Sequence, residues 1–262
     1  RESVVSDALR LINKADKERL IKPVGICRIF KANSSGYDDI EIYGSDEEEH
    51  PAPIILHTLR QQAKKPVSGK IRSVNSCNLA LADFVMPAEC GRKDYIGAFF
   101  VTAGVEAEIF EESFLRESDQ YNAIMVRLIS DRIAEAFSEY LHRKVRMEFW
   151  GYGSNEEEKN QMNQKSFTGI KPAPGYPALP DHTAKDMIWK LLDVNKITGA
   201  TLTGSMAMRP ASSVAGFYFA HPLSKYFSVG KILLDQIEDY ASRKGVTAAD
   251  AKKWLEPWLS QK

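Results

Sequence analysis

The chain has 262 residues, 44% of them hydrophobic, which is enough apolar material for a packed core without stapling disulfides or metals. Lysine plus arginine and aspartate plus glutamate both number 35, so the charge balance excludes the basic footprint of a nucleic-acid-binding protein and a polybasic membrane patch. Cys27, Cys77 and Cys90 are odd in number and contain no Cys-x-x-Cys pair, which argues against a metal or redox site and favours a reducing cytosol.

The longest apolar run, residues 96–105, is far shorter than the roughly 20 residues that cross a bilayer, and no signal peptide is visible. We therefore expect a cytoplasmic protein that binds neither a membrane nor a nucleic acid. The chain begins with Arg1 directly on a helical pattern, and this predicts a fragment cut from a longer polypeptide.

The first part of the chain mixes one helix with short strands. Residues 3–20 carry apolar side chains at helical spacing, so we predict an amphipathic helix that ends before Pro23. Two β-favouring runs, residues 24–30 and 39–43, are predicted to pair antiparallel across a turn at residues 33–36.

Shorter elements follow. The acidic run at residues 46–49 is predicted to be a solvated loop, and residues 53–62 a strand that leads into a short helix. Residues 64–78 are polar and predicted to be a surface connection. Residues 79–85 and 95–102 are predicted to be two more short elements, the second a buried strand.

The most strongly periodic segment, residues 119–150, predicts a helix of roughly 45 Å that forms the spine of the core. Its apolar stripe comprises Met125, Leu128, Ile129, Ile133, Ala136, Phe137, Tyr140, Leu141, Val145 and Phe149. A different face aligns Arg127, Asp131, Glu135, Ser138 and His142.

On this second face, Asp131 and Glu135 stand four residues apart, and like charges at that spacing are mildly destabilising. From the residues alone, the simplest interpretation is that Arg127 and Arg132 neutralise the two carboxylates on a solvated face.

A polar loop at residues 153–166 precedes residues 171–180, Lys-Pro-Ala-Pro-Gly-Tyr-Pro-Ala-Leu-Pro, which hold four prolines and one glycine. Proline fixes φ and glycine permits positive φ, so we predict a stiff, sharply turned loop. We expect the N–H groups of Ala173, Gly175 and Tyr176 to face a ligand, at little entropic cost. A rigid connector before the next helix is the alternative.

The remainder predicts a helix capped by Asp181 or Thr183 and ended by Gly199. His182 and His221 have no second ligand at metal-binding spacing, so we predict no metal site.

Residues 215–220 and 225–232 are predicted to be paired strands, and residues 235–244 and 247–255 two short helices. Irregularly interleaved elements predict a single α+β domain with a mainly antiparallel sheet and one long central helix.

The wording of the proline-rich loop, followed by Asp-His-Thr, resembles the S-adenosylmethionine-binding loop in the activation (reactivation) domain of cobalamin-dependent methionine synthase. The resemblance spans nearly the whole chain. It also includes Leu-Ala-Asp-Phe-Val at 81–85, Asp-Tyr-Ile-Gly-Ala-Phe at 94–99, Asp-Arg-Ile-Ala-Glu-Ala-Phe at 131–137, Ser-Lys-Tyr-Phe at 224–227 and Asp-Gln-Ile-Glu-Asp-Tyr-Ala at 235–241.

This resemblance implies a module that caps a cobalamin-binding domain and positions S-adenosylmethionine for reductive methylation of cob(II)alamin, with an electron from a flavodoxin or a diflavin reductase. The full enzyme would transfer a methyl group from methyltetrahydrofolate to homocysteine. Cobalamin, bound by the neighbouring domain, carries the chemistry, so no catalytic side chain is implied and the fragment alone is not expected to be a complete catalyst.

The residues that the resemblance assigns to the ligand are Lys171, Ala173, Gly175, Tyr176, Tyr226 and Phe227. It also implies that Asp131 and Glu135 face the cobalamin domain, where a carboxylate raises the pKa of the histidine released from cobalt.

Two departures from the family weaken the implied pocket. Lys171 replaces the common arginine and loses its planar two-point grip on a carboxylate. An upstream Asp-Trp segment of the family is absent, since no tryptophan precedes Trp150. The alternative is therefore a docking module that keeps the fold without ligand binding. A conventional methyltransferase is disfavoured because no Gly-x-Gly-x-x-Gly occurs.

Overall fold

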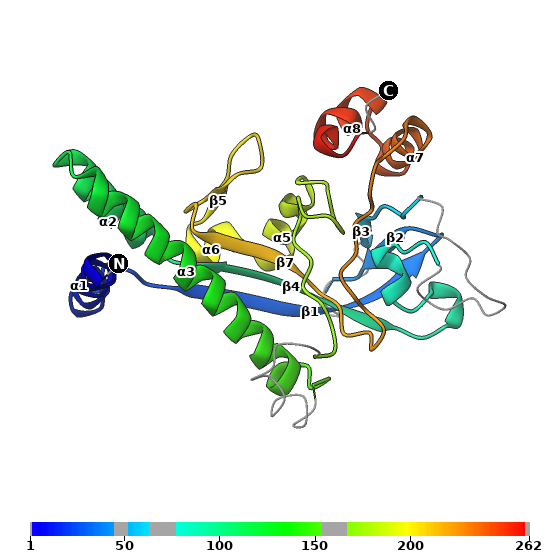
Figure 1. The fold of residues 1–262 in the computed structure, drawn as a ribbon. Helices are drawn as coiled ribbons and strands as arrows, with labels where there is room; N and C mark the ends of the chain where they lie inside the picture. The colour runs from blue at the N-terminus through cyan, green and yellow to red at the C-terminus, as the bar shows by residue number, and fades with distance from the viewer. Residues whose placement is uncertain (1, 45–51, 63–76, 154–166, 260–262) are drawn as a thin grey trace. The chain divides into compact units, whose positions relative to one another are not determined.

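A computed structural model describes residues 2–44, 52–62, 77–153 and 167–259 (Figure 1). The predictions for residues 46–49, for most of the connection at 64–78 and for residues 154–166 lie outside the described residues. Contacts divide the chain into two compact units: Arg1–Arg28, Ala98–Gly151 and Ile188–Gly216 form the first, and Ile29–Gly97, Tyr152–Met187 and Phe217–Lys262 form the second. Each unit is thus assembled from three separate stretches of the chain.

A five-stranded sheet has the order β3-β2-β1-β4-β7. Its strands are β1 (Val24–Ser35), β2 (Asp39–Ile42), β3 (Ile54–His57), β4 (Asp94–Thr102) and β7 (Ser213–Tyr218). β1 pairs antiparallel with β2, and β2 with β3. The predicted α+β class with a mainly antiparallel sheet is confirmed. The first turn is displaced from the prediction, because β1 continues through Ser35 and Gly36 takes the positive φ of +59°.

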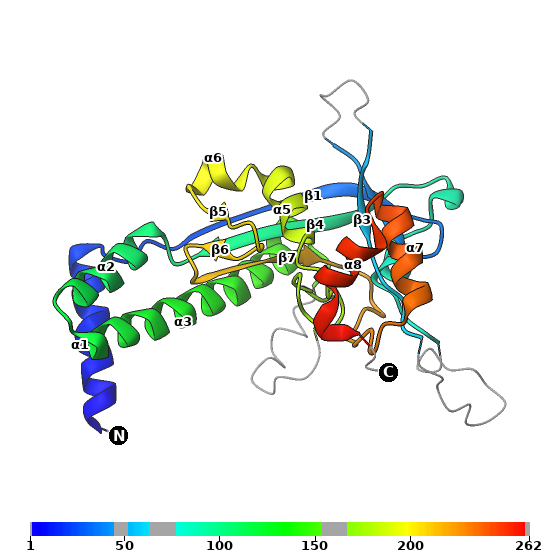
Figure 2. The same ribbon diagram turned by 90° about the horizontal axis from the view of Figure 1, so that it is seen from above.

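The first unit includes α1 (Glu2–Glu18), α2 (Val105–Arg116) and α3 (Gln120–Lys144), which a π-helical turn (Val145–Phe149) extends. The predicted long helix is confirmed. α2, which the sequence reasoning did not predict, lies along α3, and α1 packs near the start of α3 (Figure 2). Their shared core is Leu11, Ala15, Phe110, Met125 and Val126.

The predicted apolar stripe on α3 is partly wrong. Leu128, Tyr140 and Phe149 are 55%, 50% and 58% exposed, although each is large and apolar or aromatic. The buried face shares Met125 and Leu141 with the predicted stripe, and its other members are mostly small or polar: Ala123, Val126, Ser130, Ala134, Ser138 and His142. Small residues permit close approach of neighbouring elements, so packing selected a face that hydrophobicity alone did not indicate.

The helix predicted after the proline-rich loop is split into α5 (Ala184–Leu192) and α6 (Val194–Thr198). Asp193 adopts a left-handed φ of +49° and breaks the helix, and Gly199 ends α6 as predicted, with φ +73°. A two-stranded hairpin, β5 (Thr201–Leu202) with β6 (Met208–Arg209), follows in the first unit.

In the second unit, α7 (Leu234–Lys244) and α8 (Ala248–Trp254) confirm the two predicted C-terminal helices, and a 3-10 turn (Glu256–Trp258) follows them (Figure 1). Gly245 ends α7 in a left-handed conformation, and the Thr247 side chain caps α8 by accepting from the Asp250 N–H. Their core contains Val229, Ile232, Ile237, Tyr240 and Leu255.

Two predictions in the second unit are wrong. The helix expected after β3 is absent from residues 58–62, and residues 225–232 do not form the strand expected to pair with β7. Phe219, just beyond β7, pairs instead with Ile170. Two short 3-10 helices, Leu81–Phe84 and Ala88–Cys90, lie between β3 and β4.

Within the described part of the chain, no helix combines the length and apolar character that crossing a membrane requires.

Candidate functional site

Residues 171–180 form an irregular, turned segment of the second unit, as predicted. They are called the ligand loop from here on, after the ligand binding that the sequence predicts for them. Backbone hydrogen bonds hold it from both sides: the Phe217 N–H donates to the Pro172 carbonyl (3.0 Å), and the Val229 N–H donates to the Pro177 carbonyl (2.9 Å). Pro172, Pro174 and Pro180 are buried, whereas Tyr176 at the tip is 67% exposed. The prolines therefore anchor the loop and leave its tip accessible.

The turn itself is closed by its own backbone. Gly175 has the predicted positive φ, +94°. Its N–H donates to the Leu179 carbonyl (2.7 Å), and the Tyr176 N–H donates to the Ala173 carbonyl (3.2 Å). The expectation that these two N–H groups face a ligand is therefore wrong, because the loop itself uses them. The loop is more rigid, and offers fewer backbone donors, than its prolines alone indicated.

The aromatic pair at 226 and 227 divides its roles. The Tyr226 hydroxyl accepts a hydrogen bond from the Lys171 N–H (3.0 Å), and its side chain is 61% exposed. Phe227 packs against the core of α7 and α8 and meets Phe84 edge-on, with ring centroids 6.3 Å apart. Tyr226 thus lies beside Lys171 at the start of the ligand loop, whereas Phe227 packs against the core.

A buried carboxylate, which the sequence reasoning treated only as a helix cap, anchors the end of the loop. Asp181 is 1% exposed, and its Oδ2 accepts from the Tyr240 hydroxyl (2.7 Å) and from Lys244 Nζ (2.5 Å), both on α7. Its Oδ1 accepts from the Thr183 N–H (2.7 Å), so the predicted cap is present as well.

Burial alone would raise the pKa of Asp181, but the charge and hydrogen bond of Lys244, together with the bonds from Tyr240 and Thr183, lower it overall. Asp181 is therefore an ionised carboxylate held inside the protein. The only sequence signal for it is the Asp-x-Thr pattern of the cap, since Tyr240 and Lys244 lie some sixty positions away.

His182 lies directly against the turn. A Cβ atom at Gly175 would be 2.0 Å from its Cε1 atom, so a side chain at position 175 would overlap the imidazole. Its Nδ1 atom lies 3.0 Å from Nζ of Lys185, which is 8% exposed. Burial and the charge of Lys185 lower the pKa of His182, while Asp181 opposes them, and burial lowers the pKa of Lys185.

The two carboxylates on α3 belong to the first unit and differ from each other. The Ser212 hydroxyl donates to Asp131 (2.6 Å), and Arg127 Nε lies 3.7 Å from the same carboxylate. Glu135 pairs with Arg132 (2.7 Å) on a more exposed surface. Arg127 and Arg132 thus neutralise Asp131 and Glu135, as the simplest interpretation of the sequence predicted.

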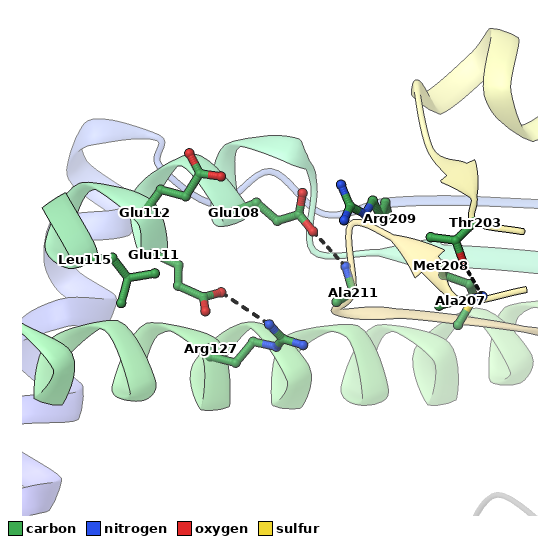
Figure 3. A pocket seen from close by; sticks show the side chains of 10 residues that line it. All are labelled: Glu108, Glu111, Glu112, Leu115, Arg127, Thr203, Ala207, Met208, Arg209 and Ala211. Carbon is green, nitrogen blue, oxygen red and sulfur yellow. Dashed lines mark hydrogen bonds and ion pairs between the residues drawn. The ribbon is translucent and has the colours of Figure 1, made fainter. Parts of the chain in front are cut away.

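A hollow of about 440 Å³ lies elsewhere in the first unit, between α2, α3 and the β5–β6 hairpin (Figure 3). Residues lining it include Glu108, Glu111, Arg127 and Arg209. Glu108 accepts from the Ala211 N–H (2.9 Å), and Glu111 pairs with Arg127 (3.5 Å). None of the residues predicted to bind a ligand lines this hollow, and two of its carboxylates already have partners.

Among the described side chains, no group of three or more His, Cys, Asp or Glu is placed to share a metal ion.

Comparison with known proteins shows which family the chain belongs to. Residues 1–245 match the family described as the activation domain of vitamin B12-dependent methionine synthase. The chain belongs to this family.

A crystal structure of the MetH reactivation domain bound to AdoHcy superposes on the activation domain with a TM-score of 0.89 at 44% sequence identity. The match covers 100% of this chain and 78% of that one. At this identity the shared fold extends to both compact units of the activation domain.

Proposed function

We propose that this activation domain binds S-adenosylmethionine at the ligand loop and presents its methyl group to a cobalamin-binding domain for reductive methylation. The observation that carries the proposal is the relative bound to AdoHcy, which is 44% identical over the whole of this chain. AdoHcy is what S-adenosylmethionine becomes after losing its methyl group, so a site for one fits the other.

The geometry of the ligand loop supports this function. A loop tied down at Pro172, Pro177 and Asp181 binds with little loss of entropy. Lys171 at its start would meet the ligand carboxylate, and the exposed Tyr176 and Tyr226 would contact the rest, alongside those backbone groups of Ala173 and Gly175 that the turn does not itself use. Phe227 would support Tyr226 from the core rather than touch the ligand.

The domain's own part in the reaction is placement. Cobalamin, held by the neighbouring domain and reduced by one electron from a flavodoxin or a diflavin reductase, would supply the nucleophile that takes the methyl group from sulfur, and AdoHcy would be left. Holding the sulfonium at a fixed position converts a bimolecular encounter into an intramolecular one, where proximity contributes roughly 7–11 kcal/mol at best. The activation domain then needs no catalytic side chain, and by itself it is not a complete methyltransferase.

The carboxylates of α3 would face the cobalamin domain. Asp131 is already bonded to Ser212, whereas the more exposed Glu135 pairs with Arg132 at the surface. Glu135 would therefore be the first carboxylate to engage a histidine released from cobalt, and it would stabilise the charged imidazole.

Calorimetric titration with S-adenosylmethionine and with AdoHcy tests the proposal. We expect saturable binding to the wild-type domain, weakened at least about tenfold by Lys171→Ala, because a charge-assisted contact is lost. Tyr226→Ala should weaken binding by a comparable factor. Lys252→Ala on α8 and Tyr37→Ala, an 88% exposed tyrosine, are the matched controls and should leave affinity unchanged.

Absence of binding to the wild-type chain would contradict the proposal and favour the docking module without ligand. Equal weakening by the control variants would contradict the placement of the site. If the wild-type chain does not bind, a longer chain that includes the family's upstream Asp-Trp segment would show whether that segment is needed to complete the pocket.

A further inference from the structure

His182 lies next to the ligand loop, although no sequence pattern predicted that it helps to bind the ligand. His182 fills the space that a side chain at Gly175 would take, so its imidazole supports the turn that carries Tyr176. His182 is also an exposed residue, so solvent reaches it.

The contact with Lys185 dictates which form of the imidazole fits. A lysine ammonium can only donate hydrogen bonds, so Nδ1 of His182, 3.0 Å away, must be the acceptor and the ring proton must be on Nε2. A protonated imidazole has no acceptor, and it would place two positive charges 3.0 Å apart. The observed arrangement therefore requires a neutral ring.

The surroundings of this pair favour the same form. Lys185 is nearly buried on α5 and has little room to turn away. Among the described residues, the anion that acts on His182 is Asp181, and its carboxylate is already bonded to Tyr240, Lys244 and Thr183. Asp181 thus has little capacity left to stabilise a charged His182.

We propose that His182 is a positioning residue of the ligand loop: its neutral imidazole holds the turn at Gly175, and protonation loosens the turn and weakens ligand binding. The predicted effect on ligand binding rests on the proposed function, whereas the predicted loosening of the turn is independent of it. Because the pKa of His182 is lowered from 6.5 in the folded loop, the open loop takes up the proton first. The ordered turn is thus fully favoured above pH 6.5 and loses stability as the pH falls below it.

The first test uses the ligand-free domain. The imidazole Cε1 resonance of His182 and the amide resonance of Gly175 are followed by NMR between pH 8 and pH 5. We expect both to titrate together, with a midpoint below 6.5. Lys185→Met should move the His182 midpoint upward, whereas Lys185→Arg should leave it low. A Gly175 amide that ignores the His182 titration would overturn the proposal.

The second test measures AdoHcy affinity by calorimetry at pH 7.5 and pH 5.5, a range in which AdoHcy keeps its zwitterionic form. The wild-type domain should bind about three- to tenfold more weakly at pH 5.5, the upper limit being complete exclusion of the protonated ring one unit below its ordinary pKa. His182→Gln, which cannot titrate, should bind equally at both pH values. His221→Gln is the control histidine and should retain the wild-type pH dependence.

The outcomes separate the two proposals. A wild-type pH dependence that persists in a folded His182→Gln variant would overturn the role of His182. If AdoHcy fails to bind at either pH, the proposed function fails, while the ligand-free titration still decides whether His182 controls the turn. Thermal unfolding of His182→Gln and His182→Asn identifies a variant that retains the fold for the comparison.

Discussion

The ligand loop in the second unit and the carboxylate face of α3 in the first unit both gather polar side chains on helices and turns, but they hold them differently. Asp181 is 1% exposed and bonded on both carboxylate oxygens, so it fixes backbone geometry. The side chain of Glu135 is 60% exposed and pairs with Arg132, a neighbour on its own helix. A buried charge with complete partners serves as an anchor, whereas an exposed pair contributes little to stability and can exchange partners.

Asp181→Ala is the variant with the largest expected effect, and it tests whether the buried carboxylate is an anchor. It leaves the buried Tyr240 hydroxyl and Lys244 without their acceptor, so we expect a loss of about 3–5 kcal/mol in the free energy of unfolding and loss of AdoHcy binding. Urea unfolding measures the first effect and calorimetry the second. Glu238→Ala, an exposed acid on α7, is the control and should change stability by less than about 0.5 kcal/mol. A loss as small as that for Asp181→Ala would show that the anchor is not needed.

Substitution of the loop glycine ranks next. In Gly175→Ala the positive φ and the overlap with His182 act together, and we expect a loss of about 2–4 kcal/mol in unfolding free energy. Gly36→Ala is the matched control, because Gly36 also has positive φ but no atom within 4 Å of an added Cβ. It should lose only about 1–2 kcal/mol, the backbone part alone. Equal losses in the two variants would contradict the contact with His182.

A third comparison tests the faces of α3. Val126 is fully buried, so Val126→Ala should destabilise the domain by about 2 kcal/mol, from lost apolar burial and the cavity left behind. Leu128, at 55% exposed, should tolerate alanine within about 0.5 kcal/mol. The same urea unfolding curves decide both. A larger loss for Leu128→Ala would restore the stripe predicted from hydrophobicity.

The smallest expected effect separates the two carboxylates of α3. Asp131→Ala removes the acceptor of the Ser212 hydroxyl, and we expect a loss of about 1 kcal/mol in unfolding free energy. Glu135→Ala removes only a surface pair and should change that free energy by less than about 0.5 kcal/mol. In a complex with the cobalamin domain the order should reverse, with Glu135→Ala weakening docking more than Asp131→Ala in a binding titration. Equal effects in both measurements would contradict different roles for the two side chains.

Local patterns predicted much of this fold, because they act over a few residues. As predicted, Gly245 ends α7 and Thr247 caps the start of α8. The proline-rich loop also takes a turned form with positive φ at Gly175. The patterns misled where a segment's partner lies far along the chain. Residues 225–232 favour a strand by composition, but β7 ends in a pairing of Phe219 with Ile170 instead.

Composition, turn chemistry and the sequences of the motifs were enough to determine the α+β class, the turned form of residues 171–180 and the family, since each depends on the identity of neighbouring residues. Only the tertiary structure decided which polar groups already have hydrogen-bond partners within the protein. It closed the N–H groups of Gly175 and Tyr176 within the loop, bonded Asp181 to Tyr240 and Lys244, and set His182 against Gly175. The physical reason is that burial and hydrogen bonding join side chains about sixty positions apart or more, and no local pattern records which of them meet.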